Sequence, residues 1–240
     1  MNAKNKKILI SLVSILLILD VPLVLYLFNF KNTAFDENFY KKEFQKYNVY
    51  GKLQDYDVEK INNDVLNYLK SEKEESIKND FFIQREKEHL LDVKNLIQKT
   101  INFYYFSLIL FFILLISLAF LLDQNIKIVK HFGIIFIISG ALTFFEAFAF
   151  FAAVNMNFSS AFDIFHNTFF QRGTYTFDPS FENIVNLYPE QLFFGIAQRI
   201  IFNTLIFSFF LSLAGILFLA AVKYNALKIK KYIKGIKNRR

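Results

Sequence analysis

Two histidines are the residues of this chain best suited to acid–base chemistry. His89 has a carboxylate three residues away on each side, Glu86 and Asp92, and helical spacing would bring both onto its arc of a helix. A carboxylate in that place can fix the tautomer of an imidazole and raise its basicity, so we predict that Glu86 or Asp92 hydrogen-bonds His89. His166 lies in a Phe-rich stretch suited to a membrane interface. For either histidine alone, a surface or packing role is the alternative.

A metal site is a competing interpretation of the same residues. Glu86, His89 and His166, together with an aspartate, could ligate zinc. The His-Glu-x-x-His spacing of zinc proteases is missing, however, and His131 is expected at the opposite membrane face. The chain has no Cys, which excludes thiolate ligands and a Cys nucleophile, and it has no P-loop and no dinucleotide-binding glycine pattern. We therefore expect no metal and no cofactor.

Two further carboxylates, Asp20 and Glu146, lie inside long apolar runs. Each is about 20 Å from the expected cytoplasmic end of its run, counted at ~1.5 Å per helical residue. Buried acids in a membrane are costly and usually face a polar interior or a cavity. We therefore predict that both face the inside of a helix bundle, near Arg199 or Asn203. A structural polar cluster that ties helices together is the alternative to a functional role.

Four apolar runs are long enough to cross roughly 30 Å of hydrocarbon. They cover residues 8–28, 101–122, 132–154 and 200–222. A cleaved signal peptide is the alternative for the first run, but this run is longer than a signal core and lacks a small-residue cleavage site, so we expect an uncleaved anchor. The predicted fold class is an all-α membrane protein with four transmembrane helices and a helical extracytoplasmic cap formed by two outer segments.

The distribution of basic residues orients these helices. Three lysines precede the first run, and eight basic residues without an acid follow the fourth. In contrast, segment 31–100 has 13 basic and 14 acidic residues, and segment 155–199 has two basic and four acidic residues. Because basic excess stays in the cytoplasm, both termini are expected there and the two long segments outside. The basic tail is expected to contact anionic lipid headgroups and not nucleic acid.

This topology divides the chain into five parts. They are the N-terminal arm with the first transmembrane helix (1–30), an extracytoplasmic helical segment (31–100), the second and third transmembrane helices with a short cytoplasmic loop (101–154), a second extracytoplasmic segment (155–199), and the fourth transmembrane helix with its basic cytoplasmic tail (200–240). Since His89 and His166 lie in the two outer segments that flank one bundle, we expect them to share a site.

The two outer segments have different patterns. Apolar periodicity within 56–78 predicts one helix, and the stretch 81–100 predicts a second that continues into the membrane helix at 101–122, because neither Gly nor Pro interrupts it. The segment 155–199 contains two prolines and Gly173 among many Phe residues. This composition predicts short helices, joined by turns, that lie against the membrane surface.

Residues 85–94, REKEHLLDVK, resemble the R-E-x-x-H-[ML]-x-D-V-K signature of a family of bacterial and archaeal integral membrane proteins that includes the lipoprotein intramolecular transacylase. The second outer segment agrees in order, with FHNTFF at 165–170, Gly173, YTFDP at 175–179 and YPE at 188–190. Tyr175 stands where the family is expected to have Trp. The four-helix layout also matches, so the resemblance covers nearly the whole chain.

The resemblance implies an enzyme that acts on lipoproteins at the outer membrane face. The family's characterised activity moves the sn-2 acyl chain of the diacylglyceryl group to the α-amine of the lipid-bearing Cys, which gives a lyso-form lipoprotein. The two signature histidines correspond to His89 and His166. The supporting residues that we infer are Arg85, Glu86, Asp92, Arg172, Tyr175 and Asp178. The implied partners are the diacylglyceryl lipoprotein and membrane lipids, and the chain is expected to act as a monomer.

This chemistry is reasonable on physical grounds. An α-amine with a pKa of about 8 attacks an ester only as its free base. A histidine can take the proton and return it to the departing glycerol oxygen, and one substrate molecule holds both reacting groups close together. Arg85, Arg172 or a backbone N–H could stabilise the oxyanion. A non-enzymatic lipid-binding or assembly factor is the alternative function, and a transporter is the third, although four helices without repeats argue against it.

Overall fold

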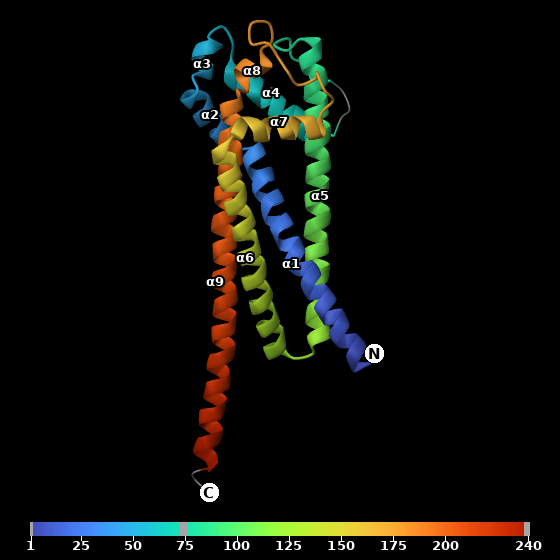
Figure 1. Cartoon of the computed structure of the whole chain (residues 1–240), viewed down its shortest axis with the longest axis vertical. Helices are drawn as coiled ribbons and strands as arrows, with labels where there is room; N and C mark the ends of the chain where they lie inside the picture. Colours follow the sequence, from blue (N-terminus) through green and yellow to red (C-terminus); the bar gives the residue numbers. More distant parts are fainter. Residues whose placement is uncertain (1, 73–75, 238–240) are drawn as a thin grey trace. The chain divides into compact units, whose positions relative to one another are not determined.

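The computed structural model describes residues 2–72 and 76–237, and their side chains as far as Lys228. Regular structure within these ranges is α-helical (Figure 1). Four helices are long and apolar enough to cross a membrane: α1 (Ala3–Ala34), α5 (Gln84–Leu122), α6 (Asn125–Met156) and α9 (Glu190–Lys237). They contain the four predicted apolar runs, which confirms this prediction. The side chains of the basic tail beyond Lys228 lie outside the described residues.

Helix α5 is longer than a membrane crossing requires. It has 39 residues, and its polar first part continues without a break into the apolar run 101–122. Since no Gly or Pro lies between its ends, nothing interrupts the backbone hydrogen bonds of the helix. The predicted continuity is therefore confirmed, except that the helix begins at Gln84 and not at 81. The signature residues 85–94 thus lie on one rigid element.

The chain forms two compact units, of which the first contains the described parts of 1–26, 106–148 and 203–240. One cluster of buried aliphatic side chains joins α1, α5 and α6 in this unit: Val13, Leu17, Leu114, Leu118, Leu122 and Ile135. Helices α6 and α9 also approach closely, because a Cβ atom added at Gly140 would collide with Ser212. Small residues permit such close packing between membrane helices, where lipid offers no hydrophobic gain.

The second unit contains the described parts of 27–105 and 149–202. Besides the ends of the long helices, it has five shorter helices: α2 (Glu37–Lys46), α3 (Val49–Lys52), α4 (Val58–Lys70), α7 (Phe158–Phe169) and α8 (Ile184–Leu187). Within this unit, α7 runs crosswise to the first part of α5 (Figure 1). Its core is a cluster of apolar side chains that includes Phe44, Val49, Leu66, Phe82, Leu187 and Leu192.

Local sequence explains the short helices of this second unit. The predicted apolar face of α4 is confirmed, because its members are all buried: Val58, Ile61, Val65, Leu66 and Leu69. Helix α4 ends at Lys70, at the start of the polar run from Ser71. Between α7 and α8, Gly173 adopts a φ of 87°, a left-handed conformation that favours glycine. Short helices joined by turns are thus confirmed for 155–199.

Candidate functional site

The two histidines singled out in the sequence lie together in the second unit. His89 is on the second turn of α5, and His166 is near the end of α7. Their rings are stacked, with an interplanar angle of 20° and 6.5 Å between the ring centroids. Both are buried, with 7% of His89 and 8% of His166 exposed. Two elements that are distant in the sequence therefore bring two imidazoles to one place.

Aromatic side chains surround both imidazoles. The Phe170 ring lies 5.0 Å from His89 and 5.5 Å from His166, measured between centroids. Phe177 lies 5.2 Å from His89, and Tyr175 lies 5.0 Å from His166. All three belong to the loop that follows α7. The histidines thus lie in an apolar aromatic environment that excludes water.

The hydrogen bonds of the two rings differ. The Nδ1 atom of His166 lies 2.8 Å from the carbonyl oxygen of Phe162, which can only accept, so this nitrogen carries the proton in the neutral ring. Its Nε2 atom then has a free lone pair. In contrast, the buried Nδ1 atom of His89 has no hydrogen-bond partner among the described residues. Only His166 therefore has its tautomer set by the protein.

Burial keeps both imidazoles neutral at pH 7. His89 precedes the apolar run of α5, and burial, followed by repulsion from His166 in its charged form and from Arg85, lowers its pKa to about 4. Burial also lowers the pKa of His166, although the Phe162 carbonyl and the nearby carboxylates favour its charged form. A neutral imidazole can accept a proton, so the electrostatics suit a general base.

The predicted hydrogen bond between a carboxylate and His89 is wrong. Glu86 is fully buried, but its two oxygens accept from the backbone N–H groups of Ile83, at 2.7 Å, and Ile184, at 2.6 Å. These N–H groups start α5 and α8 and have no partner inside their own helices, so they compete for the carboxylate. Asp92 makes no hydrogen bond to His89 in the part of the chain that the structure describes.

Arg85 binds the loop that covers the histidines. Its Nη1 atom donates to the carboxylate of Glu182 at 2.5 Å. Its Nη2 atom donates to the carbonyl oxygens of Gly173, at 2.9 Å, and Thr176, at 2.5 Å. The guanidinium also lies 4.8 Å from the centroid of the Phe177 ring. Arg85 is therefore engaged with the loop, and its geometry suits positioning better than oxyanion binding.

The other predicted supporting residues also belong to this loop. The hydroxyl of Tyr175 donates to the side chain of Asn167 at 2.7 Å, which ties the loop to α7. Asp178 contributes its backbone N–H, which donates to Glu182 at 2.6 Å. Arg172 is exposed and makes no hydrogen bond within the described ranges. Tyr175 and Asp178 thus shape the loop, while Arg172 lies at its surface.

Neither Phe177 nor Glu182 stands out in the sequence as a site residue, although both belong to this arrangement. Phe177 is the central residue of the YTFDP pattern, so the pattern itself is a signal that could have marked it. Glu182 has no such signal, because it pairs with Arg85 across 97 positions of the chain. Its burial, with 5% of the residue exposed, becomes visible only in the fold.

The two intramembrane acids, Asp20 and Glu146, both belong to the first unit. Asp20 is buried in the first unit, where it accepts a hydrogen bond from the hydroxyl of Ser107 at 2.5 Å. Glu146 on α6 is half-buried. No hydrogen bond joins Asn203 to either acid among the described residues. A hydroxyl, not an amide or a guanidinium, is the partner of Asp20.

Arg199 makes an ion pair of its own, and its proximity to these acids stays a prediction. In the second unit, the guanidinium of Arg199 donates to Asp36 at 2.5 Å and lies over the ring of Phe39. The other oxygen of Asp36 accepts from the backbone N–H of Phe39 and caps α2. An ion pair at a helix end costs less than a charge within the apolar span, which explains this choice of partner.

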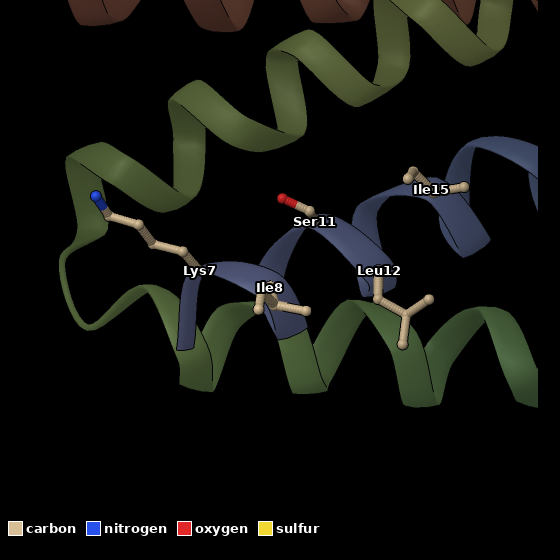
Figure 2. A pocket seen from close by; sticks show the side chains of 5 residues that line it. All are labelled: Lys7, Ile8, Ser11, Leu12 and Ile15. Atoms are coloured by element: carbon tan, nitrogen blue, oxygen red, sulfur yellow. The ribbon is translucent and has the colours of Figure 1, made fainter. Parts of the chain in front are cut away.

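Two hollows in the surface are lined by neither histidine. One follows α1 in the first unit and is lined by Lys7, Ile8, Ser11, Leu12 and Ile15 (Figure 2). Its lining is mostly apolar and comes from one helix, so it offers no set of converging polar groups. The other, in the second unit, lies beside Glu43, Lys46 and Arg199. Within the described ranges, no three His, Asp or Glu side chains come together as a metal site.

Comparison with known proteins identifies the fold. A solved structure of the membrane integral lipoprotein intramolecular transacylase Lit from Bacillus cereus matches with a TM-score of 0.70 and 19% identity, over 93% of this chain and 98% of that one. A variant of that protein with a histidine replaced by alanine matches with a TM-score of 0.72 and 18% identity, over 96% and 100% of the two chains. These likenesses show that this chain shares the fold. No curated protein matches it.

The family model gives the stronger result. It matches residues 14–194 and is described as lipoprotein intramolecular transacylase Lit. The matched range includes both histidines, the loop over them, most of α1, all of α5 and α6, and the start of α9. The resemblance of residues 85–94 is thereby confirmed. This multi-pass integral membrane chain belongs to the lipoprotein intramolecular transacylase Lit family, a family of enzymes that modify lipoproteins.

Proposed function

We propose that this chain moves the sn-2 acyl chain of a diacylglyceryl-modified lipoprotein to the α-amine of its N-terminal Cys, with lyso-form lipoprotein as the product. The observation that carries the proposal is the stacked pair of buried, neutral histidines in a chain of this family. The surrounding aromatic side chains make an apolar environment suited to a lipid ester.

His166 is the general base in this proposal. Its Nδ1 atom is held by the Phe162 carbonyl, so Nε2 has the lone pair that can take the proton of the attacking amine. The same nitrogen then returns the proton to the glycerol oxygen as the acyl C–O bond breaks. The Phe162 carbonyl and the nearby Asp163 and Glu190 charges favour the protonated ring, which lowers the cost of the intermediate.

His89 has the role of orienting the substrate. Its buried Nδ1 atom has no partner in the described protein, and an unpaired buried polar atom is costly, so a hydrogen bond to the substrate would stabilise the complex. With pKa lowered to about 4, His89 stays neutral and adds no positive charge beside the amine. Its neutrality supports this role.

The proposal also places the protein in the cell membrane. The basic arm and tail favour cytoplasmic termini, with the histidines on the extracytoplasmic face. Lipoproteins carry their diacylglyceryl group in a membrane, so the histidines would meet this group in the outer leaflet. We propose a monomer that acts on lipoproteins and membrane lipids, without nucleic acid and without a cofactor.

Mass spectrometry of lipoprotein N-termini tests this function. Cells that express the chain are expected to accumulate N-acyl, S-monoacylglyceryl lipoproteins, and cells without it are expected to keep the S-diacylglyceryl form. The S-diacylglyceryl form and the lyso form have the same mass and differ only in the atom that carries the second acyl chain. Fragmentation at the N-terminal Cys therefore distinguishes them. An unchanged diacylglyceryl form in both strains would favour a lipid-binding or assembly role instead.

The pH dependence of the transfer rate is expected to follow the titration of the substrate amine and not that of the histidines. A free amine with a pKa of about 8 is required for attack, so the rate should rise with pH until that value. Because burial lowers the pKa of both histidines below the ordinary value, the base is lost only when the pH falls below 6.5. On a logarithmic plot the rate should therefore rise with a slope of about one between pH 6.5 and 7.5. The measurement uses purified protein and a synthetic diacylglyceryl lipopeptide, and a slope that increases clearly above one as the pH falls toward 6.5 would contradict the proposed neutral base.

A further inference from the structure

The loop 170–182 covers the two histidines, and we name it the aromatic strap. Three of its side chains, Phe170, Tyr175 and Phe177, contact the imidazoles with centroid distances of 5.0 to 5.5 Å. Less than a tenth of each histidine is exposed, and these rings form part of the aromatic cover over the imidazoles, together with Phe162 of α7 on His166.

A polar latch holds the strap to the first turn of α5. The carboxylate of Glu182 accepts from Arg85 through Oε1 and from the backbone N–H of Asp178 through Oε2. Arg85 also binds two strap carbonyls and contacts the ring of Phe177, the residue that packs on His89. The side chain of Glu182 is only 7% exposed, whereas that of Arg85 is 43% exposed, so the pair is shielded from water on the carboxylate side.

A neutral histidine can act as the base for more than one nucleophile. The base that takes a proton from an amine can equally take one from water, provided that water reaches the ester. Water would attack the sn-2 carbonyl carbon with its oxygen while its proton passes to the histidine. The acyl C–O bond would then break, and the proton would return to the glycerol oxygen. This step consumes one water and gives a free fatty acid and an S-monoacylglyceryl lipoprotein whose α-amine stays free.

We infer that the aromatic strap, held by the Arg85–Glu182 latch, suppresses a latent lipoprotein ester-hydrolase activity and so commits the acyl group to the amine. The inference rests on the proposed function, because it concerns the fate of the same ester. Exclusion of water from a closed site is a known means of preventing hydrolysis of reactive groups, and here the excluding groups are named aromatic rings. Arg85 and Glu182 are positioning residues in this scheme.

The experiment compares hydrolysis with transfer in purified full-length protein. The substrate is a diacylglyceryl lipopeptide in water enriched in ¹⁸O, so that hydrolysis appears as labelled fatty acid and transfer as N-acylated lipopeptide. Glu182→Gln weakens the latch, and Phe177→Ala opens the wall over His89. Each is expected to raise the ratio of hydrolysis to transfer about tenfold, which corresponds to a change of ~1.4 kcal/mol between the two barriers.

Glu59→Gln is the matched control. Glu59 also forms an ion pair, with Lys41 at 2.7 Å, but it lies at the surface and contacts neither histidine. The ratio of hydrolysis to transfer in this variant should equal that of the unaltered chain. Phe177→Leu, which keeps an apolar side chain, is measured as well in case the alanine variant does not accumulate, and it should raise the ratio less.

The outcomes separate the two proposals. If the unaltered chain makes no N-acylated lipopeptide, the proposed function fails. If it makes this product, and the Glu182 and Phe177 variants lose hydrolysis and transfer in equal proportion, the residues are merely structural and the strap inference is overturned. A raised share of ¹⁸O-labelled fatty acid, with transfer lowered, supports the inference.

Discussion

Replacing His166 by alanine is expected to reduce production of lyso-form lipoprotein by about two to four orders of magnitude, the usual cost of losing a general base, and replacing His89 by alanine is also expected to abolish most of it. His166→Ala removes the nitrogen that takes the proton from the amine. His89→Ala removes the stacked neighbour whose unpaired Nδ1 is proposed to bind the substrate. Single-turnover rates with a synthetic lipopeptide measure both losses. The protein should still insert and accumulate, because each change deletes a side chain without adding charge.

His131→Ala is the matched control for His166→Ala. In both histidines, Nδ1 lies 2.8 Å from the carbonyl oxygen four residues earlier on a helix. His131 is only half-buried, however, whereas His166 is buried beside His89. The control should therefore keep full activity. If both His89 and His166 can be replaced without loss of acyl transfer, the histidine mechanism must be abandoned.

Glu86→Ala is expected to destabilise the second unit strongly. Its fully buried carboxylate accepts from two backbone N–H groups, at Ile83 and at Ile184. The buried N–H of Ile184, left unpaired, costs about 1 to 3 kcal/mol, and the part-buried N–H of Ile83 adds to this cost only as far as water does not reach it. This is a large share of the total stability of a typical domain, about 5 to 15 kcal/mol. We expect a lower melting temperature in detergent, and faster hydrogen exchange at the Ile83 and Ile184 amides.

Glu88→Ala provides the comparison on the same turn of α5. Glu88 is exposed and accepts only from the side chain of Gln84, at 3.0 Å. Its loss should change the stability by no more than about 0.5 kcal/mol, as at most surface positions. Equal melting temperatures for the Glu86 and Glu88 variants would show that the buried carboxylate does not hold α5 and α8 together.

The sequence by itself determines the helices that cross the membrane and the place of the signature within them. The length of an apolar run follows from the bilayer thickness, which is a property of the solvent and not of any partner. The continuity of α5 likewise follows from the absence of Gly and Pro between Gln84 and Leu122. The buried face of α4 is visible in the spacing of its apolar residues. The spacing of residues 85–94 also identifies the family.

Only the tertiary structure decides which polar groups pair. Helical spacing suggests that the carboxylate of Glu86 bonds to His89. The fold, however, brings the start of α8 to α5, and the carboxylate accepts from an N–H of α8 at 2.6 Å instead. Arg85 pairs with Glu182, which is 97 positions away in the sequence, and Arg199 pairs with Asp36, which is 163 positions away. Apolar burial is not directional, so composition and period predict it. A hydrogen bond requires a donor and an acceptor within about 3 Å in a fixed direction, and local spacing cannot specify that for residues so far apart in the chain.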